Sequence, residues 1–308
     1  MMKGKDIVSA LDLDRDILLQ LFEGAEAATR SKAFRIAEDR TLITAFFEPS
    51  TRTRLSFTAA MLKLGGKVAD FGTVETTSLK KGESFEDTIK MLDGYEPDVI
   101  VLRHKIEGSA RIAADIARHP VVNAGDGKNE HPTQALTDLY TMWKLFGKID
   151  GLKVGLLGDL KHSRTVSSLS YTLSMFKDIK LYCIAPRILQ MRQEVLDKIS
   201  GKIEYQSLAG IDELVDEIDV LYITRVQKER FTDPQEYEKV KGSYIVDPSF
   251  LSKLKKTPVI MHPLPRVNEI TTEVDSLPQA KYFEQATNGM YVRMALLASI
   301  MGLKIPAR

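Results

Sequence analysis

The chain has 308 residues, of which 44% are hydrophobic and 28% are charged, as in an ordinary globular protein. Lysine and arginine total 43 and aspartate and glutamate total 42, so a net charge of +1 offers no general attraction for nucleic acid or a membrane surface. The longest apolar run, near residues 294–303, is far shorter than the roughly 20 residues that span a bilayer. The first residues lack the apolar segment of a signal peptide, so we expect a cytoplasmic protein with no membrane or nucleic-acid partner.

Short β-rich runs alternate with helical stretches along the chain, which predicts α/β layers built on parallel sheets. In the first half, Gly65 and Gly66 end one helix, on which Leu55, Ala59 and Leu62 recur at a helical period. We expect strands at residues 41–48, 67–72, 98–104 and 120–125, and helices at 14–28, 52–64, 108–119, 132–146 and from Ser84, where Asp87 completes a capping box.

The stretch Gly147–Gly151 is the best candidate for a linker, and a second βα series follows it. A long helix is expected at residues 282–301. The single cysteine, Cys183, lies in an apolar run and is expected to be a buried, inert side chain, because one thiol can form neither an internal disulfide nor a cysteine-based zinc site. We expect strands at residues 152–159, 179–185, 202–207, 219–224, 243–247 and 258–262.

The segment Glu48–Arg54 contains the sharpest local signal, because it joins the end of a strand to the start of a helix. Unpaired N–H groups and the dipole at a helix N-terminus favour an anion. Ser50, Thr51 and Thr53 add hydroxyl donors, and Arg52 and Arg54 are arginines that can grip phosphate oxygens with two nitrogens. The pattern predicts a phosphate site without the glycines of a P-loop. A helix cap followed by solvated arginines is the alternative.

Two further clusters of the first half follow strand ends. Arg103 ends the strand at residues 98–104, and in doubly wound sheets ligands bind beyond the carboxyl ends of strands. His131 and Gln134 sit where a loop enters a helix, so both can point into one pocket, and an imidazole can donate a hydrogen bond to a carbonyl oxygen. Taken singly, Arg103 could equally be a surface residue and His131 a structural cap.

A polar loop contains Ser78, Lys80 and Lys81. Adjacent lysines usually mean a solvated surface, but a mobile loop with a lysine could instead close on an anionic ligand.

In the second half, Arg164 and Arg225 each lie just past a strand, which suggests recognition of a dicarboxylate. Gly155 and Gly158 make only part of a dinucleotide-binding fingerprint, so a nucleotide-binding redox domain is a weak alternative. In the segment His262–Arg266, prolines on both sides of Leu264 would expose its carbonyl as an acceptor for an NH₂ group; the alternative is a stiff loop.

The motifs as a set resemble the aspartate/ornithine carbamoyltransferase family, in order and spacing, over nearly the whole chain. The segments Thr224–Arg230 and His262–Arg266 look like the aspartate branch, and Pro263 stands where the ornithine branch has a cysteine. The resemblance implies two doubly wound parallel-sheet α/β domains. Residues 1–146, with the C-terminal helix (about 285–308) packing back on them, would bind carbamoyl phosphate, and residues 147–284 would bind L-aspartate.

The resemblance also implies a role for each motif residue, and neither a cofactor nor a metal. Ser50, Thr51, Arg52 and Thr53 would hold the phosphate, while Thr53, Arg103 and His131 would donate to the carbonyl oxygen. The carbamoyl NH₂ would donate to Gln134 and to the carbonyls of Leu264 and Pro265. Lys81 and Ser78 would come from the adjacent chain of a homotrimer with shared sites; Lys81 is preferred to Lys80 because it directly precedes Gly82. Arg164, Arg225 and Gln227 would hold the aspartate carboxylates.

The implied reaction is carbamoyl transfer from carbamoyl phosphate to L-aspartate, an early step of pyrimidine biosynthesis. No nucleophile with an adjacent base is evident, so we expect direct transfer without a covalent enzyme intermediate. The alternatives are another acceptor such as ornithine, whose side-chain ammonium the arginines and Lys81 should repel, and a non-catalytic scaffold. The sequence leaves open whether a zinc-bearing regulatory chain binds.

Overall fold

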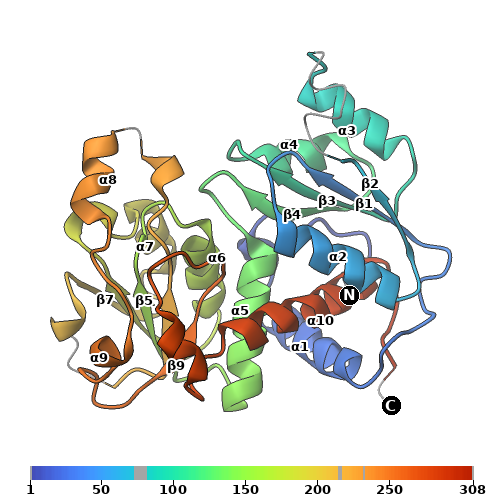
Figure 1. The fold of residues 1–308 in the computed structure, drawn as a ribbon. Coiled ribbons are helices and arrows are strands. Elements are labelled where there is room, and N and C mark those ends of the chain that lie inside the picture. The colour runs from blue at the N-terminus through green and yellow to red at the C-terminus, as the bar shows by residue number, and fades with distance from the viewer. Residues whose placement is uncertain (1, 73–81, 214–216, 232, 307–308) are drawn as a thin grey trace. The chain divides into compact units, whose positions relative to one another are not determined.

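The computed structural model describes residues 2–72, 82–213, 217–231 and 233–306. The chain forms two compact units, Met1–Tyr140 with Thr287–Arg308, and Thr141–Ala286. The division falls inside two long helices, α5 (Pro132–Phe146) and α10 (Tyr282–Ile300), which both units share (Figure 1). The expected linker, residues 147–151, follows the end of α5.

The first unit is built on a four-stranded parallel sheet in the order β2-β1-β3-β4. Its strands are β1 (Thr41–Phe46), β2 (Lys67–Asp70), β3 (Val99–His104) and β4 (Val121–Asp126). Its helices, besides parts of α5 and α10, are η1 (Ala10–Asp12), α1 (Arg15–Thr29), α2 (Thr51–Lys63), α3 (Phe85–Asp93) and α4 (Ser109–Ile116).

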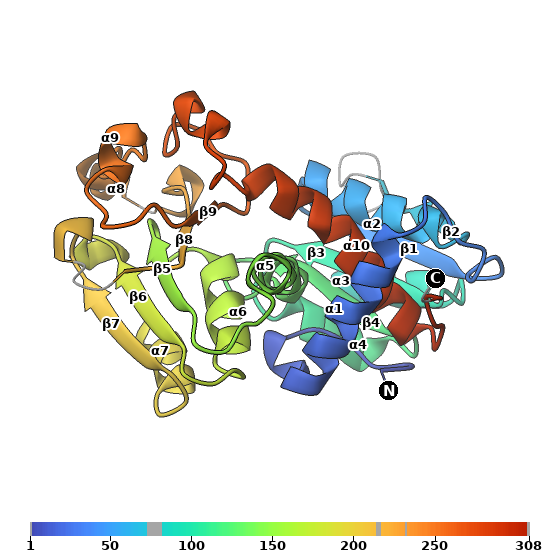
Figure 2. The same ribbon diagram turned by 90° about the horizontal axis from the view of Figure 1, so that it is seen from below.

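Helices cover both faces of this sheet. Ile43 and Ile100 on one face pack with Ile89 of α3 and Ala113 of α4 in one buried cluster. Helix α2 lies on the opposite face with α1 and α10, as Figures 1 and 2 both show. The unit therefore has the doubly wound architecture that the sequence predicts.

Helix α2 is confirmed, but the leucines whose spacing predicted it do not lie on its buried face. Phe57 and Met61 are fully buried, whereas Leu55 and Leu62 are 61% and 58% exposed. Leu55 and Leu62 share a helical period with each other, but that stripe faces away from the sheet. The glycine stop is confirmed, because Gly65 has a φ of +90°, the left-handed conformation that favours glycine.

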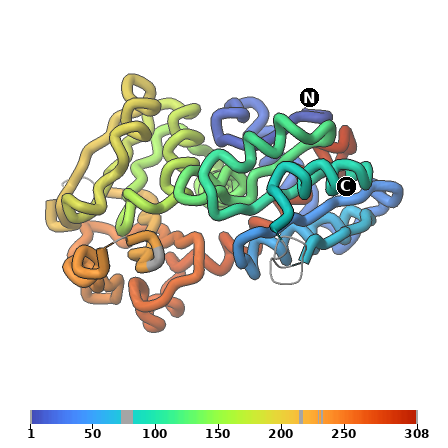
Figure 3. Tube along the Cα trace, turned by 90° about the horizontal axis from the view of Figure 1, so that it is seen from above, coloured from blue at the N-terminus to red at the C-terminus, as the bar shows by residue number. Residues whose placement is uncertain are grey.

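The C-terminal part of α10 packs back on the first unit, as predicted. A Cβ atom at Gly24 of α1 would lie 3.2 Å from the Cβ of Ala295, so glycine allows the two helices to approach closely. At the end of α10, the carbonyl of Ile300 accepts a 2.9 Å hydrogen bond from the N–H of Gly4. Figure 3 shows the two ends of the chain in the same region.

The second unit contains a five-stranded parallel sheet in the order β7-β6-β5-β8-β9. Its strands are β5 (Lys153–Leu157), β6 (Lys180–Ile184), β7 (Glu204–Leu208), β8 (Val220–Ile223) and β9 (Val259–Met261). Its helices are α6 (Arg164–Leu173), η4 (Arg187–Leu189), α7 (Gln193–Ile199), η5 (Ile211–Glu213), η6 (Lys228–Arg230), α8 (Pro234–Val240), α9 (Pro248–Leu251) and η7 (Thr272–Ser276).

The two faces of this second sheet are also covered. Leu157, Ile223 and Ile260 form a core with Leu251 of α9, while α6 and α7 lie on the other face (Figure 2). Cys183 is fully buried, and burial raises the pKa of its thiol to about 12, so it is the inert core residue that was expected.

The strand expected at residues 243–247 is absent. Only Val246 forms a bridge there, to Ile270. Asp247 caps α9 by accepting the N–H of Phe250 at 2.6 Å, and Pro248 is the first residue of that helix. The β-branched run therefore turns into a helix before a ladder can form.

Replacing Gly65 by alanine tests the stop of α2. A Cβ atom there would lie 2.8 Å from the Phe34 carbonyl oxygen, whereas at Gly108, with a φ of +79°, nothing lies within 4 Å. Gly108→Ala should cost about 1 kcal/mol from backbone strain alone. Gly65→Ala should cost about 1–3 kcal/mol more, because overpacking adds to the same strain. Urea unfolding of both variants measures the difference, and equal losses would contradict it.

Candidate active site

Each sheet has one point at which the order of its strands reverses. In the first unit the chain goes from β1 outward to β2 and then returns to β3 on the other side of β1; in the second unit β5 and β8 flank the corresponding point. Ligands of open α/β sheets bind outside the carboxyl ends of such strand pairs. Residues 50–53 follow β1, Arg103 lies in β3, Arg164 follows β5 and Arg225 follows β8, so the polar clusters found in the sequence lie at these two points.

The turn after β1 presents an open helix N-terminus. Ser50 is the N-cap of α2 with an extended backbone (φ −158°), and its side chain makes no capping hydrogen bond. Thr51 and Arg52 are the first residues of the helix, and Thr53 is buried beneath them. Hydroxyls and unpaired N–H groups at one helix end are what an anion needs. Ser50 therefore occupies the N-cap position without the side-chain hydrogen bond that a serine cap usually makes.

The two arginines of this motif have different surroundings. Arg54 is engaged by Asp70 of β2: its Nε donates to Oδ1 at 2.8 Å, and its Nη2 donates to Oδ2. Arg54 is thereby tied to the edge of the sheet. Arg52 is the arginine that the family resemblance assigns to the anion.

Arg103 lies beside this turn because its strand pairs with β1, with Phe46 and Arg103 in register. Its Nη2 donates to Oε1 of Glu48 at 3.0 Å, and its Nη1 lies 3.5 Å from the carbonyl oxygen of Ala124. The side chain is only 13% exposed. Glu48, for which the sequence predicted no role, therefore holds the Arg103 guanidinium at the carboxyl end of the sheet.

His131 and Gln134 lie at the start of α5, in the first unit. His131 is buried, with Nδ1 3.4 Å from Oγ1 of Thr133. The Nε2 of Gln134 donates to Oδ1 of Asp138 at 2.7 Å. Because a carboxylate can only accept, the amide NH₂ must face Asp138, and Oε1 is the end of the amide that can accept from a ligand.

A buried charge on α10 accompanies Asp138. Arg293 is 4% exposed, and its guanidinium lies 5.1 Å from the centre of the Phe57 ring. Burial lowers the pKa of Arg293 to about 10, and the charge of Asp138 opposes that change. The sequence did not point to Asp138 or Arg293, because they are far apart in the chain and belong to no motif.

The second unit places Arg164 at the start of α6 and Arg225 just past β8, on neighbouring strands. Gln227 is held by Asp159, which accepts its N–H at 3.3 Å, and by the carbonyl of His162, which accepts from Nε2 at 3.3 Å. Two cationic side chains and an amide thus follow adjacent strand ends, which suits a ligand with two carboxylates.

Gly155 and Gly158 serve packing. A Cβ atom at Gly155 would lie 3.2 Å from Cδ1 of Ile218, and one at Gly158 would lie 2.2 Å from the Thr224 carbonyl oxygen. Gly155 therefore leaves room for side chains packed on the sheet, and Gly158 lets the turn after β5 approach the backbone of Thr224. This removes the main support for a dinucleotide site.

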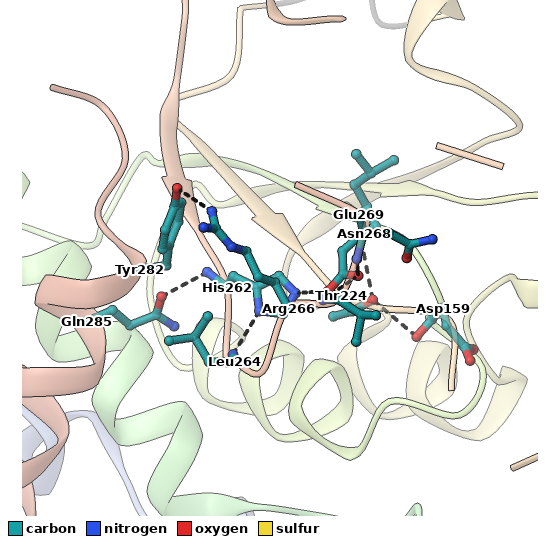
Figure 4. A network of polar contacts seen from close by, with 11 residues as sticks. Asp159, Thr224, His262, Leu264, Arg266, Asn268, Glu269, Tyr282 and Gln285 are labelled. Atoms are coloured by element: carbon teal, nitrogen blue, oxygen red, sulfur yellow. Dashed lines mark hydrogen bonds and ion pairs between the residues drawn. The ribbon is translucent and has the colours of Figure 1, made fainter. Parts of the chain in front are cut away.

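The segment His262–Arg266 follows β9. Leu264 has a φ of +52°, and the Leu264–Pro265 peptide bond is cis. Arg266 is anchored on Asp275, which accepts from Nη2 at 2.6 Å. It also donates from Nη1 to the hydroxyl of Tyr282 at 3.1 Å (Figure 4). Side chains therefore hold this segment in addition to its two prolines.

Three further expectations concern the polar loop, a metal site and a membrane span. Ser78, Lys80 and Lys81 lie outside the described residues. Within the described ranges, no cluster of three histidine, cysteine, aspartate or glutamate side chains is placed to bind a metal. No helix in the described part of the chain is long and apolar enough to cross a membrane.

Comparison with protein families gives two matches that together span the chain. Residues 5–144 match the carbamoyl-phosphate-binding domain of aspartate/ornithine carbamoyltransferases, and residues 150–300 match the aspartate/ornithine-binding domain. The chain therefore belongs to the aspartate/ornithine carbamoyltransferase family.

Individual relatives cover almost the whole chain. The aspartate carbamoyltransferase catalytic subunit of Thermofilum pendens is 50% identical over 97% of this chain and 95% of its own length. That of Thermococcus onnurineus is 50% identical over 98% of both chains. Among solved structures, aspartate transcarbamoylase from Trypanosoma cruzi in complex with carbamoyl phosphate and aspartate is 39% identical, with a TM-score of 0.93 over 97% of this chain and 98% of that one.

Binding of inorganic phosphate tests the anion site without a measurement of enzyme activity. Inorganic phosphate at about a hundred times its Kd should stabilise the protein by about 2.7 kcal/mol. Arg52→Ala should weaken phosphate binding about tenfold or more, because it removes charge-assisted hydrogen bonds. Arg54→Ala is the matched control and should keep most of the affinity, since Asp70 engages Arg54. Calorimetric titration with phosphate measures both, and an equal loss in the two variants would contradict the assignment.

Proposed function

We propose that the protein transfers the carbamoyl group of carbamoyl phosphate to the amine of L-aspartate, giving N-carbamoyl-L-aspartate and phosphate, on the route to pyrimidines. The observation that carries this proposal is the likeness over 97% of the chain to the Trypanosoma cruzi enzyme in complex with both of these substrates. The geometry is consistent with it, since the anion site at α2 and the paired arginines at β5 and β8 suit a phosphate and a diacid.

L-Aspartate is favoured over ornithine as the acceptor. The catalytic subunits of Thermofilum pendens and Thermococcus onnurineus that match at 50% identity are named for aspartate. Pro263 occupies the position at which the ornithine branch has a cysteine. Arg164 and Arg225 would attract the second carboxylate of aspartate and repel the side-chain ammonium of ornithine.

In the first unit, Ser50, Thr51 and Arg52 would hold the phosphate group. Thr53, Arg103 and His131 would donate hydrogen bonds to the carbonyl oxygen, and Oε1 of Gln134 would accept from the NH₂ group. This orientation of Gln134 is supported by its hydrogen bond to Asp138. In the second unit, the Leu264 and Pro265 carbonyls would accept from the same NH₂ group.

The chemistry follows from these roles. The neutral amine of aspartate attacks the carbonyl carbon, the bond from that carbon to the phosphate oxygen breaks, and the departing phosphate takes the amine proton. Negative charge that develops on the carbonyl oxygen is stabilised by the donors of Thr53, Arg103 and His131, and the loss of one such donor typically costs about 2.7–4 kcal/mol in the barrier. Holding the two substrates in position supplies much of the remaining acceleration.

We also propose the homotrimer with shared sites that the family resemblance implies. A groove of about 720 Å³ supports a contact between copies of the chain. It runs along α2 and β2, is lined by Ser50 and Thr51 as well as by Leu55, Leu62 and Val68, and leaves those leucines exposed. An apolar surface of this kind beside a binding site suits a second copy of the chain.

Acceptor choice is tested by comparing L-aspartate and ornithine at a fixed concentration of carbamoyl phosphate. Carbamoyl aspartate should form and carbamoyl ornithine should not. Arg225→Ala should raise the KM for aspartate about tenfold or more through the loss of a charge-assisted contact, with a smaller change in the KM for carbamoyl phosphate. Arg187→Ala, in the exposed helix η4, is the control. Turnover of ornithine alone would contradict the proposal.

Shared sites are tested by mixing two inactive variants. Arg52→Ala and Lys81→Ala should each have little activity, because each damages every site. If one site uses Arg52 from one chain and Lys81 from the next, trimers reassembled from both variants contain some native sites and regain part of the activity. Reassembly confirmed by native mass spectrometry without any recovery would contradict the cross-chain role of Lys81.

A further inference from the structure

The unusual backbone conformation of Leu264 must be held by contacts with other residues. Its φ of +52° is unusual for a leucine, because the Cβ atom comes close to the following carbonyl oxygen. Its side chain packs against the core of the second unit, so a different backbone conformation would take the side chain out of that contact. The direction of its carbonyl group therefore depends on what holds the backbone on either side.

His262 holds the backbone directly. The N–H of Leu264 donates to Nδ1 of His262 at 2.8 Å, so Nδ1 must be without a proton. The proton of the neutral ring is then on Nε2, which faces Oε1 of Glu269 at 2.8 Å. The His262 side chain is only 1% exposed, and its own N–H donates to Oε1 of Gln285 at 2.9 Å. The ring therefore has one orientation and one tautomer.

Glu269 closes the loop from the other side. Its Oε2 accepts the N–H groups of Val267 and Asn268, both at 3.1 Å, while its Oε1 faces His262. Burial raises the pKa of Glu269, but the hydrogen bonds from His262 and from backbone N–H groups outweigh it and hold the pKa below its usual value. One buried carboxylate thus connects His262, which precedes the segment Pro263–Pro265, to Asn268, which follows it, as Figure 4 shows.

We propose that His262 and Glu269 are positioning residues that aim the Leu264 and Pro265 carbonyls at the NH₂ group of carbamoyl phosphate, and that they thereby discriminate against acyl phosphates without an NH₂ group. The inference rests on the proposed function. Acetyl phosphate carries a methyl group in place of NH₂, so it cannot donate to either carbonyl. A displaced carbonyl weakens the binding of carbamoyl phosphate and leaves that of acetyl phosphate almost unchanged.

The test compares two substitutions of the same histidine. The amide oxygen of an asparagine falls near the position of Nδ1, so His262→Asn keeps an acceptor for the N–H of Leu264. A glutamine amide falls near Nε2, so His262→Gln keeps the contact with Glu269 and loses that acceptor. Glu269→Gln places an NH₂ group where Val267 and Asn268 need an acceptor. His119→Gln, which breaks a 2.7 Å histidine–aspartate pair with Asp93 in the first unit, is the matched control.

The quantity to measure is the ratio of the inhibition constant of acetyl phosphate to the KM of carbamoyl phosphate, with inorganic phosphate as a reference inhibitor. The ratio should fall about tenfold in His262→Gln and Glu269→Gln, and change little in His262→Asn and His119→Gln. A merely structural role would shift all three ligands together. An unchanged ratio in an active His262→Gln enzyme, or equal losses in the two His262 variants, would overturn the inference.

A measurement on the unaltered protein keeps the inference testable if a variant does not fold. The chain has five histidines, so ¹⁵N-labelled imidazole signals can be assigned one by one. His262 should be a neutral ring protonated on Nε2 at pH 7, and a proton on Nδ1 would overturn the inference. If the unaltered protein fails to carbamoylate aspartate, the proposed function is wrong, and that outcome is separate from a failure of the positioning argument.

Discussion

The open N-terminus of α2 beside Arg103 is the feature on which the rest of the account depends. A strand that ends at Phe46 and a helix that begins at Thr51 leave unpaired N–H groups at the carboxyl edge of the sheet. Pairing of β1 with β3 brings the Arg103 guanidinium to the same edge. A helix end and a cation together contribute positive potential at this edge of the sheet, where open α/β sheets bind their ligands.

Buried or half-buried carboxylates hold the groups that would meet the substrates. Glu48 holds Arg103, Asp138 fixes the amide of Gln134, and Glu269 fixes His262 and the loop around Leu264. A carboxylate can only accept hydrogen bonds, so Asp138 fixes which end of the Gln134 amide faces it, and Glu269 faces the protonated nitrogen of the neutral His262 ring. Such preorganisation lowers the cost of ordering these groups when a ligand binds.

The sequence predicted the features that depend on residues close together in the chain. The residues after each strand, the helix starts at Ser84 and Pro132, and the long C-terminal helix all follow from neighbours along the chain. The carboxylate partners could not be found in this way, because Glu48 lies 55 residues from Arg103 and nothing in the sequence links Asp138 to Arg293.

Two differences between the sequence analysis and the structure have the same physical origin. Leu55 and Leu62 follow a helical period, yet they line a surface groove, because Phe57 and Met61 occupy the face towards the sheet. The run at residues 243–247 has the composition of a strand, but Asp247 and Pro248 begin a helix there. Periodicity predicts that a helix forms, whereas the face that it buries depends on tertiary contacts.

The most direct test of the central claim is a crystal structure of the protein soaked with carbamoyl phosphate. The account predicts the phosphate group at the N-terminus of α2, within hydrogen-bond distance of the N–H groups and hydroxyls of residues 51–53, with the carbonyl oxygen facing Arg103. A carbamoyl phosphate molecule bound elsewhere, while the start of α2 holds only solvent, would contradict it.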